Sequence, residues 1–192
     1  MKQLTTALAL LIALAAPPTV LGGPRTGPRG EVSITIFKKA RQLWLYRDHQ
    51  PAKVYRVFLG SSPMGDKTQH GDNRTPEGDY RIIEKRSDSK FHRFITIDYP
   101  NLDDANRAYE EGRVTASQWA DILYASAKGI KPPWNTPLGG FLGIHGIGDN
   151  EPFKLRLIDD WDWTNGCVAL KNSDVEELFH LVAVGTAVRI RK

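Results

Sequence analysis

Three β-strands are predicted by the segment VSITIFKKARQLWLYRDHQPAKVYRVFL, which spans residues 32–59. Its apolar runs at 32–37, 43–46 and 53–59 are rich in β-branched and aromatic residues, which favour extended structure. Short polar breaks separate these runs, so that each strand can turn back along the previous one. The segment therefore predicts a β-meander at the start of the folded chain.

The rest of the chain adds strands and a few helices. Further strands are predicted at 79–84, 91–98, 141–145, 168–170 and 187–190. Apolar residues at helical spacing predict helices at 103–110 and 117–128, and a capping-box pattern opens another at 173–181. We therefore expect one mainly β domain at 31–192 with peripheral helices, including a helical insertion around 103–140.

Residues 1–22 are predicted to be a signal peptide, because Lys2 precedes an apolar run at 7–16. This run is too short to cross a bilayer as a mature helix, although an uncleaved membrane anchor is the alternative. Residues 23–30 are rich in Pro and Gly and predict a flexible leader. We therefore expect export, with no stable membrane insertion after signal cleavage.

The composition also limits the classes of partner. The formal net charge of +4 is only mildly basic for a chain of 192 residues. No block of Lys and Arg is interleaved with aromatic residues, so we expect no nucleic-acid partner.

The chain contains a single cysteine, Cys167, which cannot form an intramolecular disulfide. In an oxidising compartment an unpaired thiol is a liability unless its reactivity is used. It follows a small-residue turn, and His145 lies upstream at a predicted strand end between Gly143 and Gly146. A thiol with an imidazole is the minimum set for covalent acyl chemistry.

Two further segments belong to the candidate site. Arg74 lies in the turn at 71–80, which we interpret as a rigid lip over a groove with a guanidinium available for a carboxylate. The acidic segment at 159–163 precedes the thiol turn. We interpret its carboxylates as surface charges and its indoles, Trp161 and Trp163, as walls of the thiol pocket. No His completes a metal set, so no metal or cofactor is expected.

The ordered motifs resemble the L,D-transpeptidase catalytic domain family of the YkuD type. The resemblance covers the opening meander, the Thr75-Pro76-x-Gly78 segment, Ile144-His145-Gly146, the thiol turn and the closing strand. The usual thiol motif of the family is Ser/Thr-His-Gly-Cys, followed by an apolar residue and Arg or Asn. Here Asn165 replaces that His and Ala169 replaces the Arg or Asn, as in a divergent branch reading Asp-Trp-Thr-x-Gly-Cys.

The resemblance implies a β-sandwich and a set of site roles. Cys167 is implied as the nucleophile and His145 as the general base and acid, held together as a thiolate–imidazolium pair. The carbonyl of Gly146 would orient the His145 ring, and the backbone N–H groups of Gly166 and Cys167 would stabilise an oxyanion. The residues expected to bind substrate are Arg74, Trp163, Asn165 and Thr164.

The implied activity is acyl transfer on peptidoglycan stem peptides in the periplasm or cell wall of a bacterium. An amine acceptor would give an L,D cross-link, and a wall-attached protein is a second possible acceptor. Because Asn165 and Ala169 depart from the motif, a murein L,D-carboxypeptidase or amidase on the same scaffold stays open. So does a murein-binding module without activity.

Overall fold

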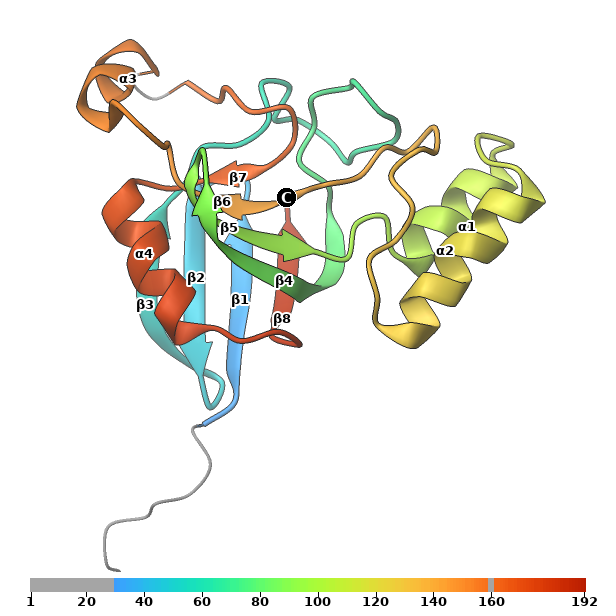
Figure 1. Ribbon diagram of the computed structural model, residues 1–192, viewed down its shortest axis with the longest axis horizontal. Helices are drawn as coiled ribbons and strands as arrows, with labels where there is room; N and C mark the ends of the chain where they lie inside the picture. The colour runs from blue at the N-terminus through green and yellow to red at the C-terminus, as the bar shows by residue number, and fades with distance from the viewer. Residues whose placement is uncertain (1–29, 159–160) are drawn as a thin grey trace, which may run out of the picture.

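The computed structural model describes residues 30–158 and 161–192. The predicted signal peptide, nearly all of the predicted leader, and the acidic pair Asp159–Asp160 lie outside the described residues. Figure 1 shows a curled sheet with one pair of helices to one side and a further helix packed against the opposite side.

Eight strands form one sheet in the order β3-β2-β1-β8-β4-β5-β6-β7. Their bounds are β1 Val32–Phe37, β2 Gln42–Arg47, β3 Gln50–Arg56, β4 Gly78–Ser89, β5 His92–Ile97, β6 Gly143–His145, β7 Val168–Ala169 and β8 Ala187–Arg191. The meander β1–β3 is antiparallel as predicted, whereas β1 with β8 and β6 with β7 are parallel pairs. The mainly β class predicted from the sequence is confirmed.

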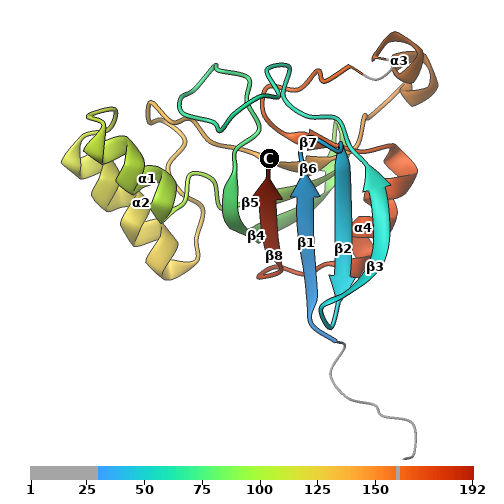
Figure 2. The same ribbon diagram turned by 180° about the vertical axis from the view of Figure 1, so that it is seen from behind.

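The long strand β4 makes the sheet fold over on itself. Its first residues, Gly78–Arg81, pair with β8, and its later residues pair with β5 across two register shifts. After β4 the strands run in a different direction. In Figures 1 and 2, β5 and β6 cross β1, β2 and β8. The expected two-layer sandwich is therefore made by two halves of one curled sheet.

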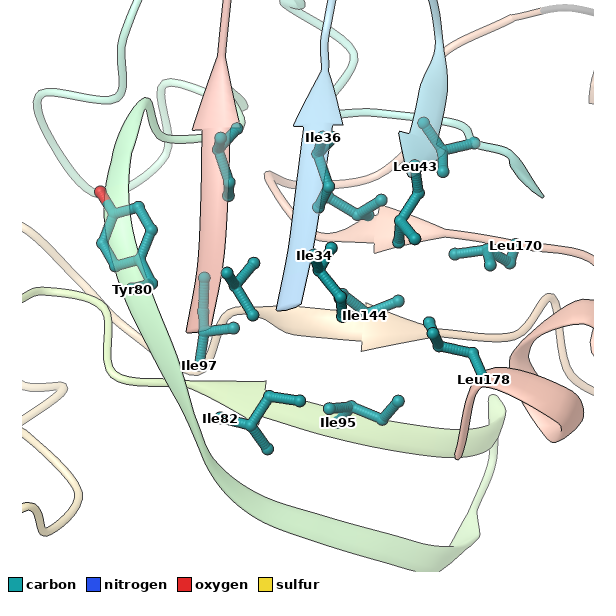
Figure 3. Close-up of a cluster of buried hydrophobic side chains, with 14 of the residues drawn as sticks. Ile34, Ile36, Leu43, Tyr80, Ile82, Ile95, Ile97, Ile144, Leu170 and Leu178 are labelled. Carbon is teal, nitrogen blue, oxygen red and sulfur yellow. The ribbon is translucent and has the colours of Figure 1, made fainter. Parts of the chain in front are cut away.

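The core lies between these two halves. Figure 3 shows Ile34, Ile36 and Leu43 on one half facing Ile95 and Ile144 on the other, and all five side chains are fully buried. Burying one such side chain stabilises the fold by about 1.5–3 kcal/mol. Helix α4 (Asn172–Leu181) closes one end of this core with Val175 and Leu178.

The predicted helical insertion is present as α1 (Leu102–Glu110) and α2 (Ala116–Lys128). Capping boxes begin both helices, at Asn101 and at Thr115, and the pair has its own small core against which Trp119 packs. The predicted capping box of α4 is wrong, because its N-cap is Lys171 and no side chain caps it.

Helix α3 (Glu151–Ile158) was not predicted, and the segment between His145 and the thiol turn was interpreted as a loop. A proline in the first helical turn, here Pro152 after Glu151, is a recognised start signal, but the helix is short and mostly exposed. No helix of the described residues is long and apolar enough to cross a membrane.

The third strand ends earlier than predicted, and this shift helps to build the site. Residues 57–59 leave β3 and run beside the thiol turn. Phe58 forms an antiparallel bridge to Ala169, and Gly60 forms a parallel bridge to Thr164. The meander therefore supports the segment that carries the cysteine.

Candidate active site

The structure brings Cys167 and His145 into one cavity of about 570 Å³. His145 ends β6, and Cys167 immediately precedes β7. These strands are parallel, with His145 opposite Ala169. Because side chains two residues apart point to the same face of a strand, this register turns Cys167 to the face that carries the imidazole.

The ring of His145 is held in one orientation. Its Nδ1 lies 2.7 Å from the carbonyl oxygen of Gly146, so Nδ1 carries the proton and Nε2 is left as the base. Phe91 stacks on the ring with centroids 4.4 Å apart, and Trp163 meets it edge-on at 5.9 Å. The residue is 2% exposed. Burial lowers its pKa to about 4, although the bond to Gly146 opposes that shift.

The thiol of Cys167 is half-buried, and its sulfur lies 3.8 Å from the carbonyl oxygen of Phe141. Burial raises its pKa to about 11, partly offset by the backbone of Gly143 and the charge of Lys67. Both charged forms lose solvation here, so the ligand-free site favours a neutral thiol beside a neutral imidazole. The expected thiolate–imidazolium pair stays a prediction, and the loss of solvation opposes it.

The thiol turn is held by the hydroxyl of Thr164. That hydroxyl donates to the carbonyl of Cys167 at 2.6 Å and accepts the N–H of Gly166 at 3.1 Å. Thr164 is buried but still lines the cavity, and both of these bonds of its hydroxyl shape the turn. The N–H of Gly166, one of the two predicted oxyanion donors, is therefore already bonded to Thr164. Within residues 30–158 and 161–192, the N–H of Cys167 has no acceptor and is the open donor.

Of the other predicted substrate-binding residues, two line the cavity and one does not. Trp163 and Asn165 form part of its wall. Arg74 is not brought there, because its guanidinium donates to the carbonyl of Asp66 at 3.3 Å. Trp161, also expected to wall the pocket, is 78% exposed and lies outside the cavity lining.

The sequence analysis missed a lysine in the cavity wall. Lys67 is buried, and its ammonium contacts the Oδ1 of Asp72 at 2.7 Å and the carbonyl of Gln69 at 3.0 Å. A lysine in a polar loop is normally solvated, so residue type gave no signal. The only sequence cue was an aspartate five residues later.

Carboxylates near the thiol turn serve structural roles. Asp162 forms a 2.6 Å ion pair with Arg41 and accepts the N–H of Leu59 at 2.8 Å, which ties the turn to the meander. No group of three or more His, Cys, Asp or Glu in the described part of the chain could hold a metal ion.

Comparison with known proteins agrees with this geometry. A model of the YkuD family, described as the L,D-transpeptidase catalytic domain, matches residues 31–190. The Escherichia coli K12 protein named "Putative L,D-transpeptidase YafK" is 34% identical over 85 residues, which is 41% of this chain and 35% of YafK. The Bacillus subtilis strain 168 protein named "Putative L,D-transpeptidase YqjB" is 24% identical over 161 residues, covering 84% of this chain and 72% of YqjB.

Two solved structures share the fold at 20% sequence identity. Bdellovibrio bacteriovorus Bd1075 has a TM-score of 0.53, over 85% of this chain and 48% of Bd1075. The helical cell shape determining protein Pgp2 (K307A mutant) of Campylobacter jejuni has a TM-score of 0.51, over 86% of this chain and 49% of Pgp2. The chain thus spans about a third of YafK and about half of these two solved chains.

Proposed function

The chain belongs to the YkuD family of L,D-transpeptidase catalytic domains, and from that premise we propose that it is a cysteine acyltransferase acting on peptidoglycan stem peptides. In this proposal it forms L,D cross-links through a thioester on Cys167. The observation that carries it is the shared cavity of Cys167 and His145, with Nε2 of the imidazole left unprotonated.

The first half of the reaction starts from the neutral pair. As the sulfur of Cys167 attacks the amide carbonyl carbon, Nε2 of His145 takes the thiol proton. The carbon–sulfur bond forms, and the N–H of Cys167 donates to the oxyanion. The carbon–nitrogen bond then breaks, and the imidazolium returns the proton to the leaving amine. The product is a thioester on Cys167 and a free amino acid.

The second half repeats the chemistry with an acceptor. An amine of a second stem peptide loses a proton to His145 and attacks the thioester carbonyl, which forms an amide cross-link. The sulfur leaves and regains its proton from the imidazolium. The pair is then restored, with no cofactor or metal needed in the cycle. A wall-attached protein would serve as acceptor through the same step.

One observation supports a hydrolytic alternative, an L,D-carboxypeptidase. Ala169, which stands where the usual motif has Arg or Asn, is fully buried against Phe58 and Ile147. A long polar side chain at that position would have no room, so the site lacks that means of anchoring an acceptor. Water would then attack the thioester in place of an amine.

The setting of this activity is the periplasm or cell wall, which follows from the substrate class. The predicted signal peptide at 1–22, which would direct export, lies outside the described residues. Export is therefore part of the proposal.

Incubation of the protein with disaccharide-tetrapeptides, followed by mass spectrometry, tests the proposal. Cross-linked dimers with a free D-amino acid support transpeptidation, and incorporation of ¹⁸O from water without dimers supports hydrolysis. Cys167→Ala should abolish both products. His145→Ala should lower the rate by about 10²–10⁴-fold, the usual contribution of a general base.

His180→Ala is the matched control, because His180 is exposed and pairs only with Glu176 on α4. Its rate should equal that of the unmodified protein. Binding of the tetrapeptide without any turnover would show an inactive murein-binding module and would overturn the proposal. Full turnover by Cys167→Ala would do the same for the nucleophile.

A further inference from the structure

The strongest unexplained feature of the cavity is a charge buried in its wall. The side chain of Lys67 is 3% exposed, and that of its partner Asp72 is 9% exposed. A lysine is rarely this buried unless its ammonium is paired, since desolvation penalises the charge. The ammonium has three hydrogens, and within the described part of the chain it has two acceptors, Asp72 and the carbonyl of Gln69. One N–H is therefore left for another acceptor.

Asp72 shares its carboxylate between the ammonium of Lys67 and the backbone of the loop. Besides the ammonium, its carboxylate accepts backbone N–H groups of Thr68, Gln69 and Arg74 at 2.8–3.1 Å. These bonds use both oxygens and fix the loop that carries Lys67. Asp72 thus acts as the anchor of the loop, and it accepts one of the three hydrogens of the ammonium.

Lys67 lies in the wall of the cavity that holds the reacting thiol. It is near enough to Cys167 for its charge to lower the pKa of that thiol. The same wall carries four aromatic side chains, from Phe91, Phe94, Phe141 and Trp163, beside polar ones that include Asn73 and Asn165. These two polar side chains are neutral amides, whereas Lys67 offers an ammonium, and a charge-assisted bond to a carboxylate is roughly twice as strong as a neutral one.

Two other cations that could take this role are placed differently. The guanidinium of Arg74 is directed to Asp66, outside the cavity lining. Lys90 reaches the cavity only from an exposed position, with its ammonium 5.0 Å from the ring centroid of Phe91. Among these three basic residues, Lys67 alone is both buried and part of the cavity lining.

We propose that Lys67 binds the free C-terminal carboxylate of the donor stem peptide, and so selects peptides whose leaving group is a terminal amino acid. This inference rests on the proposed function. The carboxylate of such a leaving group is attached to the carbon that carries the scissile nitrogen. Its binding site must therefore lie close to the nucleophile, in the cavity that Lys67 shares with Cys167. Peptides that are amidated or extended at this end would lose the ion pair.

A binding cycle in the Cys167→Ala background tests this without turnover. The ligands are a disaccharide-tetrapeptide and the same peptide with its C-terminal carboxylate converted to an amide. Titration calorimetry measures both with Lys67 present and with Lys67→Met. We expect amidation to weaken binding by about 10-fold or more with Lys67, the usual size for a hydrogen bond to a charged group. With Lys67→Met the effect should shrink to about 2-fold or less.

Two variants separate recognition from structure. Lys67→Arg keeps the charge and should keep part of the discrimination. Lys90→Met removes a rim cation and should keep all of it. Because Lys67→Met leaves the carboxylate of Asp72 without its ammonium, thermal unfolding of each variant is measured in parallel. A loss of stability alone would weaken both ligands equally and would leave their ratio unchanged.

The inference is overturned if amidation changes binding by the same factor with Lys67 and with Lys67→Met, or if neither peptide binds. Failure of the proposed function has a different signature. The unmodified protein would then release no amino acid from the tetrapeptide, whatever the binding cycle shows. Normal release with no Lys67-dependent discrimination would keep the function and remove this role for Lys67.

Discussion

Replacing Gly166 with alanine should destabilise the protein strongly, because two independent penalties meet at this residue. Its φ is 128°, a conformation that side chains rarely adopt, and an added Cβ would lie 2.7 Å from the carbonyl oxygen of Arg74. The backbone strain is worth about 1–3 kcal/mol. The overlap with a backbone atom that cannot rotate away adds about 1–3 kcal/mol. We expect a total of about 2–6 kcal/mol, measured by urea unfolding.

Gly185→Ala isolates the backbone strain, so the difference between the two variants gives the steric part. Gly185 also has a positive φ, of 90°, but an added Cβ there would meet no atom within 4 Å. It should therefore show only the strain, about 1–3 kcal/mol. Because Gly166 adjoins the nucleophile, its variant should also change the alkylation rate of Cys167, whereas Gly185→Ala should not. Equal destabilisation by the two variants would refute the claim that the Arg74 carbonyl packs against the thiol turn.

Three further outcomes are expected. Since burial favours the neutral forms of Cys167 and His145, the rate of alkylation by iodoacetamide should rise about tenfold per pH unit between pH 6 and 9. A plateau in that range would indicate an ion pair instead. Burial raises the pKa of the Asp104 carboxyl to about 6. Ionisation of this carboxyl should therefore lower the free energy of unfolding as the pH rises from 4 through 6. Relative to Asp104→Asn, this loss is on the order of 3 kcal/mol in chemical unfolding, and parallel pH curves would contradict it. Asp162→Ala removes the ion-pair partner of Arg41 and the acceptor of the Leu59 N–H. It should therefore destabilise the protein by about 2–4 kcal/mol. An unchanged urea midpoint would show that the ion pair does not hold the turn.

Local patterns in the sequence were sufficient for most of the elements. β1 was predicted at its observed bounds, and α1 and α2 to within one residue at each end. These elements bury one face against neighbours, so their apolar spacing records their structure. The parallel pairing of β1 with β8 joins opposite ends of the chain. Local spacing carries no information on such a pairing.

Part of the candidate site could also be predicted from the sequence, and part could not. A single thiol and a glycine-flanked imidazole indicated which residues share the cavity. The direction of a long or small polar side chain was not predictable, because it depends on tertiary partners. Arg74 turns to a carbonyl outside the cavity, Thr164 turns inward to hold its own turn, and Lys67 is drawn inside by Asp72.

Trapping of the acyl-enzyme tests the central claim most directly. The protein is mixed with a disaccharide-tetrapeptide, quenched in acid within one turnover, digested and analysed by mass spectrometry. A mass increase on the peptide that contains Cys167, equal to the mass of the donor minus the mass of the released amino acid, is the expected result. It should be absent from Cys167→Ala. Product formation with no adduct on Cys167, or with the acyl group on another residue, would contradict the account.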